Sequence, residues 1–324
     1  MSFSSETRHE LMIKACYYYY EREYTQTRIA EMLGISRLTL GNLLKEARST
    51  GLVRIEIQDK DNLTEMLKLE SELCSRFSLS SAVVVNAVEN SKEAVSNAVA
   101  RAGADFISRR IRSDMKISIS WGDTINNMAG RLPYDSSVKN IEVITLLGGA
   151  ATTNARVQPG MVAGKLLEHY SGRGYVINAP FFCRDELSCR SFRAEQNFID
   201  ISAKWQESDL FIVGVGEKPS NDESYWAHTG CSPEMLEYII QSEAAGDICG
   251  SYFDENGAKC CDEFENHRIG IDINEFRGRK NVVVMAGGER KLQAIKAALK
   301  GKFMDILVTD CYTARSLLGH GQET

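Results

Sequence analysis

Side chains that can recognise DNA bases are spaced along one face of a segment near the N-terminus. The sequence SRLTLGNLLK begins at Ser36 and places Arg37, Thr39, Asn42 and Lys45 opposite a set of apolar residues. Arg can donate two hydrogen bonds to guanine, Asn can pair with adenine, and Thr can touch a thymine methyl group. We therefore expect a DNA-reading surface, the alternative being an ordinary solvated helix face. The candidate DNA-binding residues are Gln26, Ser36, Arg37, Thr39, Asn42 and Lys45.

A second kind of chemistry is indicated by glycine-containing turns that follow apolar segments. They read SWGDT, LLGG, VGVGE and MAGGERK, and two of them carry suitable anion donors, Thr124 and Lys291. Glycine lets backbone N–H groups approach a ligand, and a helix N-terminus that follows attracts an anion. Four such turns predict a pocket for a phosphate or a sugar phosphate. No turn matches GxxxxGK[ST] or a complete GxGxxG, which argues against a nucleotide site.

The elements that would position the DNA-reading residues follow from hydrophobic periodicity. Apolar residues recur at helical spacing over residues 29–33 and 40–47, and a suitable N-cap precedes each segment. Residues 53–57 alternate between apolar and polar types, as a half-buried strand does. Together with an earlier helix over residues 6–21, this pattern predicts a winged-type helix-turn-helix domain.

From residue 82 onward, short apolar segments alternate with amphipathic ones. AVVVN is followed by SKEAVSNAVARAGADFISRRI, and NVVVMAGGERKLQAIKAALKG is followed by FMDILVTD. This order of strand, turn and helix predicts an α/β fold with a mostly parallel sheet. Ligands of such sheets bind outside the carboxyl ends of the strands, which is where the glycine-containing turns lie.

Residues 58–80 are expected to form a connector helix between the two parts of the chain. Among charged residues, one helical stripe consists of Leu63, Met66, Leu67, Leu73, Cys74 and Phe77. The stripe could pack against the large domain or against another subunit, and we favour the large domain.

Length and composition indicate the number of domains and the general class of protein. The chain has 324 residues, which predicts two domains, over residues 1–57 and 58–324. An apolar content of 43% and a charged content of 25% are typical of a soluble globular protein. Because no apolar run of about 18 residues and no signal peptide are evident, we expect a cytoplasmic protein without membrane contact. The net charge is −6, but residues 25–55 carry five basic and two acidic residues, so a mildly basic segment precedes an acidic body.

The nine cysteines and five histidines are scattered without the spacing of a metal site. No CxxC or HExxH occurs, and the adjacent Cys260 and Cys261 are poor partners for one tetrahedral ion. We expect reduced thiols, no structural metal and no cofactor.

Six separated motifs resemble the SorC family of bacterial transcriptional regulators. They are YYYYEREYTQTRIAEMLGISRLTLGNLLKEARSTGLVRIEI, ISWGDTINNMA, NAPFF, SDLFIVGVGE, AAGDICGSYFDENG and AGGERKLQAIKAALKGKFMDILVTDCYTARSLL. The resemblance runs from residue 7 to residue 318 and keeps the family's order. It implies a helix-turn-helix head on a sugar-binding body related to the ribose-phosphate isomerase and glucosamine-phosphate deaminase fold. It also implies a homo-oligomer, most simply a tetramer, whose binding to double-stranded operator DNA responds to a phosphorylated sugar or polyol.

The resemblance further implies where the effector binds. The family's phosphate-holding turn falls on Gly122, Asp123 and Thr124, and the remaining effector positions fall on Gly148, Gly149, Gln158, Asp247 and Lys291. The sequence departs from the family at two places. Gly41 and Asn42 replace a Ser-Arg pair of the recognition helix, so a different operator is expected. Asp123 stands where Thr or Ser would suit a phosphate better.

Two classes of function fit these patterns. The favoured one is a DNA-binding regulator of a carbohydrate catabolic operon, gated by its effector and without catalytic residues. The alternative is a sugar-phosphate isomerase or deaminase-like enzyme, in which Asp123 or Asp247 would form an acid–base pair with Lys291. An enzyme has no evident need for a DNA reader. Simpler readings of single residues are a helix cap for Asp247 and a solvated position for Lys291.

Overall fold

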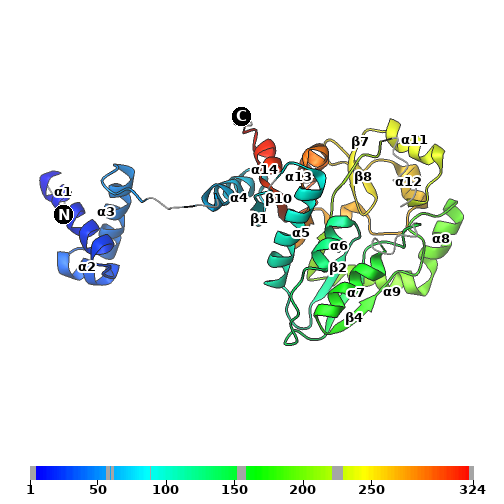
Figure 1. Ribbon diagram of the computed structural model, residues 1–324, viewed down its shortest axis with the longest axis horizontal. Coiled ribbons are helices and arrows are strands. Elements are labelled where there is room, and N and C mark those ends of the chain that lie inside the picture. The colour runs from blue at the N-terminus through cyan, green and yellow to red at the C-terminus, as the bar shows by residue number, and fades with distance from the viewer. Residues whose placement is uncertain are drawn as a thin grey trace. The chain divides into compact units, whose positions relative to one another are not determined.

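The chain folds as two compact units (Figure 1). The computed structural model describes residues 5–55, 59, 62–87, 89–151, 158–220 and 229–320. The division falls between Met1–Lys60 and Asp61–Thr324, whereas the sequence predicted a boundary after residue 57. In the described ranges no helix combines the length and the apolar character needed to cross a membrane.

The N-terminal unit consists of helices around one small core. Its elements are α1 (Ser5–Cys16), a π-helical turn (Tyr17–Glu21), α2 (Gln26–Leu33) and α3 (Arg37–Ser49). The side chain of Thr25 accepts a hydrogen bond from the Arg28 N–H, and Gly34 ends α2 in the left-handed conformation. Ser36 caps α3 in the same way, because its hydroxyl accepts from the Thr39 N–H. The buried side chains are Met12, Ala15, Cys16, Ile29, Ala30, Leu40, Leu43, Leu44 and Ala47.

The strand predicted over residues 53–57 does not form at the three of these residues that the structure describes. Residues 53–55 lie outside any strand, and the Val53 N–H donates to the Ala47 carbonyl in the turn that ends α3. Residues 56 and 57 lie outside the described residues. The described part of this unit contains no second strand that could accept a ladder of hydrogen bonds, so apolar–polar alternation alone was not sufficient to form one.

The second unit is built on a seven-stranded sheet in which every pair is parallel, which confirms the predicted α/β class. The strand order is β1-β10-β9-β5-β2-β3-β4. A smaller antiparallel sheet has the order β6-β7-β8. The bounds are β1 Ser81–Val85, β2 Lys116–Ile119, β3 Ile141–Thr145, β4 Gly172–Tyr175, β5 Leu210–Val213, β6 Gly216–Glu217, β7 Ala244–Ile248, β8 Ser251–Asp254, β9 Val282–Met285 and β10 Ile306–Asp310.

Helices bury both faces of the large sheet. One apolar core lies between the sheet and α5 (Lys92–Ser108), α6 (Asp123–Ala129) and α7 (Pro159–His169). The other core is formed with α4 (Leu63–Phe77), α8 (Glu186–Ala194), α9 (Gln196–Gln206), α11 (Pro233–Gln241), α12 (Asp262–His267), α13 (Leu292–Lys300) and α14 (Cys311–Leu318). The central strands β5 and β9 are buried along their whole length, as expected for a sheet covered on both sides.

The predicted connector helix, α4, packs against the large unit rather than standing free. Met66, Leu69 and Leu73 are buried in the core that α4 shares with α14 and β1. Polar contacts reinforce the packing, because Glu65 pairs with Arg315 at 2.5 Å. The predicted apolar stripe is wrong at Leu63 and Leu67, which are 61% and 55% exposed. Leu69 lies in the buried stripe instead, since it falls at the i+3 position from Met66.

Replacing Leu73 should therefore destabilise the large unit. Leu73→Ala removes a fully buried side chain and should lower the free energy of unfolding by about 2–5 kcal/mol, measured by urea denaturation. Leu67→Ala, on the exposed side of the same helix, is the matched control and should change it by less than about 0.5 kcal/mol. Equal losses for the two variants would contradict the packing of α4.

Candidate functional site

A cavity of about 380 Å³ opens beside the carboxyl ends of three neighbouring strands, β2, β5 and β9. Its size is within the range of small-molecule sites. The segments that follow these strands form much of its wall, and α5, the small sheet and Phe181 add to it. The polar and aromatic lining residues include Lys92, Ser96, Ser120, Trp121, Asp123, Thr124, Phe181, Glu217, Lys218, Asp247, Arg290 and Lys291.

The structure brings five of the eight predicted effector residues to this cavity. Gly122, Asp123 and Thr124 form the first turn of α6, and the Thr124 hydroxyl lies 2.9 Å from the hydroxyl of Ser96. Gly122 has φ 122°, a conformation that side chains other than glycine rarely adopt. Asp247 and Lys291 complete the five, reaching the cavity from the small sheet and from the segment after β9.

Gly148, Gly149 and Gln158 are not among the residues that line the cavity. They lie beyond the end of β3, which is farther from β9 in the strand order than β2 is. The Gly149 N–H donates to the Ala179 carbonyl at 2.8 Å, and the Gln158 side chain both accepts from and donates to the backbone of Ala150. Their described contacts therefore brace a loop, and residues 152–157 between them lie outside the described residues.

The position of Lys291 depends on a tight glycine turn after β9. Gly288 has φ 96°, and its N–H donates to the carboxylate of Asp310 at 3.0 Å and to the hydroxyl of Thr313 at 2.8 Å. A β-carbon on Gly287 would lie 2.3 Å from that carboxylate, so only glycine fits. Asp310 is fully buried at the N-cap of α14, which makes the turn a rigid base for the lysine that follows.

Lys291 is a half-buried cation in this cavity. Its ammonium group makes no hydrogen bond or ion pair with any residue in the described ranges. Burial lowers the pKa of Lys291, and the nearby cation Lys92 acts in the same direction. The carboxylates of Asp247, Glu217 and Asp123 oppose that shift without cancelling it. An anionic ligand would supply the missing negative charge and favour the ammonium form.

Asp247 lies on β7, not at the start of a helix, so the helix-cap reading is wrong. Burial raises the pKa of its carboxyl group, although the Gly250 N–H donates to its Oδ2 at 2.8 Å and favours the ionised form. A β-carbon on Gly216 would lie 2.0 Å from the other carboxylate oxygen. The neighbouring strand β6 therefore requires glycine at this position for Asp247 to reach the cavity.

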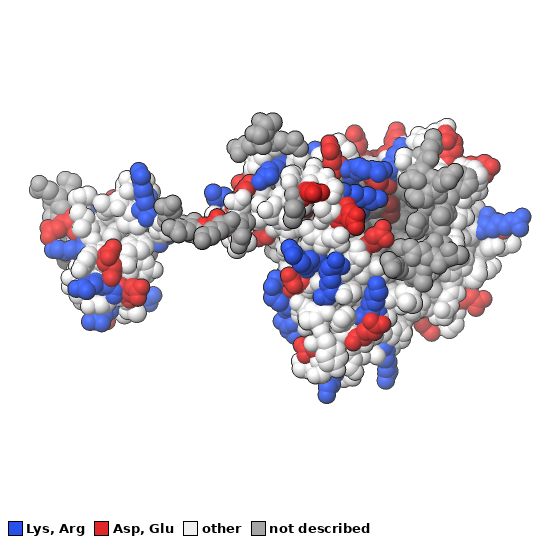
Figure 2. All heavy atoms as spheres, viewed as in Figure 1, with Lys and Arg blue, Asp and Glu red and all other residues white. Residues whose placement is uncertain are grey.

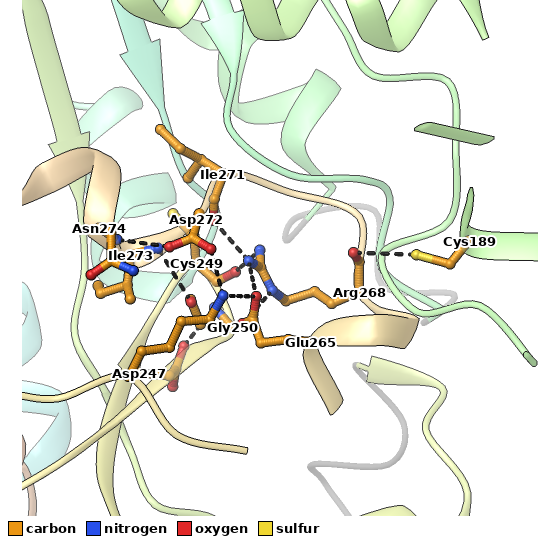
Figure 3. A network of polar contacts seen from close by, with 12 residues as sticks. Cys189, Asp247, Cys249, Gly250, Glu265, Arg268, Ile271, Asp272, Ile273 and Asn274 are labelled. Carbon is orange, nitrogen blue, oxygen red and sulfur yellow. Dashed lines mark hydrogen bonds and ion pairs between the residues drawn. The ribbon is translucent and has the colours of Figure 1, made fainter. Parts of the chain in front are cut away.

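A buried guanidinium group supports the wall that carries Asp247 (Figure 3). Arg268 is fully buried and donates to both carboxylate oxygens of Glu265, at 3.1 and 3.0 Å. It also donates to the carbonyls of Cys249 and Ile271, at 3.0 and 2.8 Å. Although burial alone would raise the pKa of Glu265, the charge of Arg268 lowers it overall. Because Cys249 precedes Gly250, Arg268 fixes the turn whose N–H holds the carboxylate.

Sequence reasoning missed several residues of the cavity. Lys92 opens α5, while Arg290 pairs with Glu217 at 3.0 Å. Trp121 both lines the cavity and packs on Phe181, with ring centroids 4.9 Å apart. The signal for Lys92 and Arg290 was present, since each follows a strand of the parallel sheet as Lys291 does.

The second candidate surface lies on α3. Arg37, Asn42 and Lys45 are exposed there, and Leu38 is 76% exposed. Nothing lies within 4 Å of the position that a β-carbon of Gly41 would take. Ser36 and Thr39 are engaged with each other in the helix cap, and Gln26 is half-buried at the first position of α2. Figure 2 shows Lys and Arg side chains on the surface of this unit, with acidic side chains among them.

The chain is similar to known proteins over most of its length. A family profile described as "Putative sugar-binding domain" matches residues 61–319. The sorbitol operon regulator of Klebsiella pneumoniae is 28% identical over 309 residues, covering 95% of this chain and 97% of the relative. The deoxyribonucleoside regulator of Bacillus subtilis is 26% identical over 311 residues, covering 96% and 98% of the two chains.

Solved structures agree with the sequence comparison. The crystal structure of the full-length sorbitol operon regulator SorC from Klebsiella pneumoniae covers 97% of this chain and 100% of its own. The two structures superpose with a TM-score of 0.73 at 28% identity. The chain belongs to the SorC family of transcriptional regulators, whose large unit is a sugar-binding domain.

Proposed function

We propose that this transcriptional regulator binds operator DNA through its N-terminal unit and that a phosphorylated sugar or polyol in the cavity gates that binding. The observation that carries the proposal is Lys291, a half-buried ammonium group in a cavity of ligand size whose described neighbours leave it without an ion pair. A dianionic phosphate is the group that such a cation would bind most strongly.

The rest of the cavity suits the other end of a sugar phosphate. The carboxylate of Asp247 can accept hydrogen bonds from sugar hydroxyls, and the hydroxyls of Ser96 and Thr124 can donate to phosphate oxygens. Trp121 and Phe181 offer an apolar surface to the carbon skeleton. Lys92 adds a second positive charge beside Lys291, so a phosphate there would be held by two cations.

The DNA part of the proposal rests on the arrangement of α2 and α3. The left-handed Gly34 and the cap at Ser36 join them by a tight turn, which is the form of a helix-turn-helix. Buried Leu40, Leu43 and Leu44 fix the inner face of α3, so Arg37 and Asn42 must point outward. In this arrangement α3 is the recognition helix.

Gating follows from population shift. The effector binds one conformation of the oligomer more tightly, and its differential affinity sets the limit on the change in DNA affinity. Because α4 packs firmly on the large unit, a rearrangement of that unit moves the start of α4 and with it the point from which the DNA-binding unit departs.

An enzyme acting on a sugar phosphate is a second candidate, and one observation favours it. Asp247 has a raised pKa and Lys291 a lowered one in the same cavity, the pattern of an acid–base pair. The relatives are named as regulators, which favours the first candidate. Turnover of a sugar phosphate by the purified protein would establish the second.

The recognition helix can be tested by substitution. Arg37→Ala and Asn42→Ala should each weaken specific operator binding by about 1–3 kcal/mol, because each removes a contact to a base edge, while binding to non-specific DNA changes less. Lys14→Ala on α1 removes one positive charge elsewhere and is the matched control. Gel shifts that find all three variants equal to the parent protein would reject the assignment of α3.

The role of Lys291 can be tested by calorimetry with phosphorylated pentoses, hexoses and polyols. Lys291→Ala should weaken a phosphorylated effector about ten- to a hundred-fold, because a charge-assisted contact contributes about 1.5–3 kcal/mol. Effector-free DNA binding should be unchanged. Lys300→Ala, at the exposed end of α13, should behave as the parent. Equal effector affinity in the parent protein and Lys291→Ala would show that Lys291 does not bind the phosphate.

We further propose that the large unit carries the oligomer contacts and that the oligomer is a tetramer. A truncated protein beginning at Asp61 keeps every core residue of that unit and should remain oligomeric in light scattering. It should bind the effector and lose DNA binding. A monomeric truncated protein would place the subunit contacts in the N-terminal unit instead.

A further inference from the structure

Two adjacent cysteines lie at a position that the proposed function does not use. Cys260 and Cys261 follow β8 and come directly before α12, and their sulfur atoms are 3.8 Å apart. Cys260 is half-buried, and Cys261 is 5% exposed. Cys261 has φ 62°, a backbone conformation uncommon for residues other than glycine. The backbone therefore holds two thiols side by side at the edge of the small sheet.

The surroundings of the pair favour a thiolate at one sulfur. The Cys261 sulfur lies 3.2 Å from the hydroxyl of Ser242, whose own carbonyl accepts a hydrogen bond from Lys218. The hydrogen bond between the two thiols lowers the pKa of Cys261, and Ser242 and Lys218 assist, while burial and Glu265 oppose the shift. The same bond raises the pKa of Cys260, together with burial. Asp254 and Asp262 add to that rise.

We propose that Cys260 and Cys261 form an oxidation site for hydrogen peroxide, at which the two thiols become a disulfide between neighbouring residues. A low-pKa thiolate beside a second thiol is the arrangement in which one cysteine reacts and the other resolves the product.

The chemistry balances with peroxide as the sole oxidant. The Cys261 thiolate attacks one peroxide oxygen, so an S–O bond forms and the O–O bond breaks. The departing hydroxide takes a proton and leaves as water. The Cys260 sulfur then attacks the Cys261 sulfenic acid, forming the S–S bond and breaking the S–O bond. The displaced hydroxyl group leaves as a second water with the proton of Cys260. Two thiols are oxidised by two electrons and one peroxide is reduced to two waters.

Closing the disulfide would disturb the wall of the cavity. The two sulfur atoms must approach from 3.8 Å to about 2.0 Å, which draws Cys261 away from Ser242. The backbone carbonyl of the same Ser242 accepts a hydrogen bond from Lys218, a residue of the cavity lining. Because adjacent α-carbons are closer than in an ordinary disulfide, the bond is strained and readily reduced again. If the proposed function holds, oxidation therefore lowers effector affinity reversibly.

Peptide mass spectrometry of the full-length protein tests the site without any effector. Cleavage after Lys259 and Arg268 releases both thiols in one peptide, CCDEFENHR. Treatment with hydrogen peroxide should remove the mass of two hydrogen atoms from this peptide, and a reductant should restore it. The rate should rise with pH as the Cys261 thiolate forms, and at a lower pH than for an ordinary thiol. Cys74, half-buried and released in a separate peptide, is the internal control and should react more slowly.

Substitutions separate the two roles. Cys260→Ser should stop the reaction at a sulfenic acid on Cys261 that dimedone traps, and Cys261→Ser should abolish the fast reaction. The proposal is overturned if the peptide keeps both thiols while Cys74 oxidises, or if Cys260→Ser yields no trapped sulfenic acid. If the mass shift occurs and effector affinity stays the same, only the link between the disulfide and the cavity is refuted. The proposed function is then unaffected.

Discussion

The parallel pairing of seven strands is the constraint on which the rest of the large unit depends. Because all strands run in one direction, their carboxyl ends lie at one edge of the sheet, and the turns that follow neighbouring strands lie side by side there. Both faces must then be covered, which explains the two separate apolar cores and the burial of β5 and β9. The cavity lies beside the carboxyl ends of β9, β5 and β2, which are neighbours in the middle of the sheet.

The polar groups behind the cavity are costly to bury and are satisfied collectively. An isolated guanidinium group in an apolar interior would be strongly unfavourable, whereas Arg268 has a carboxylate and two carbonyls as acceptors. Asp310 has an equivalent role at the turn before Lys291, where it accepts from Gly288 and Thr313. The two buried groups thus fix the turns behind Asp247 and Lys291, two ionisable residues that line the cavity.

The sequence predicted those features that local chemistry decides. Residues adjacent in the sequence determine the helix caps at Thr25 and Ser36, the apolar spacing in α3 and the strand–turn–helix order of the large unit. The structure contains all three features. Strand order is a property of the whole sheet. The turn after β3 looks the same in sequence as the turn after β9, yet its residues Gly148 and Gly149 are not in the cavity lining, because β3 lies farther out. Arg268 gave no signal, since its partners come from residues brought together only by the fold.

The docking of α4 also makes the chain modular. The division between the two units falls at residue 60, just before α4, and every buried side chain of α4 belongs to an apolar core of the large unit. A recombination event or a designed fusion at this joint would exchange the N-terminal helical unit and leave the cavity and the buried charges behind it intact. Under the proposed function, such an exchange would connect one effector to different sets of genes by replacing a single short segment of coding sequence.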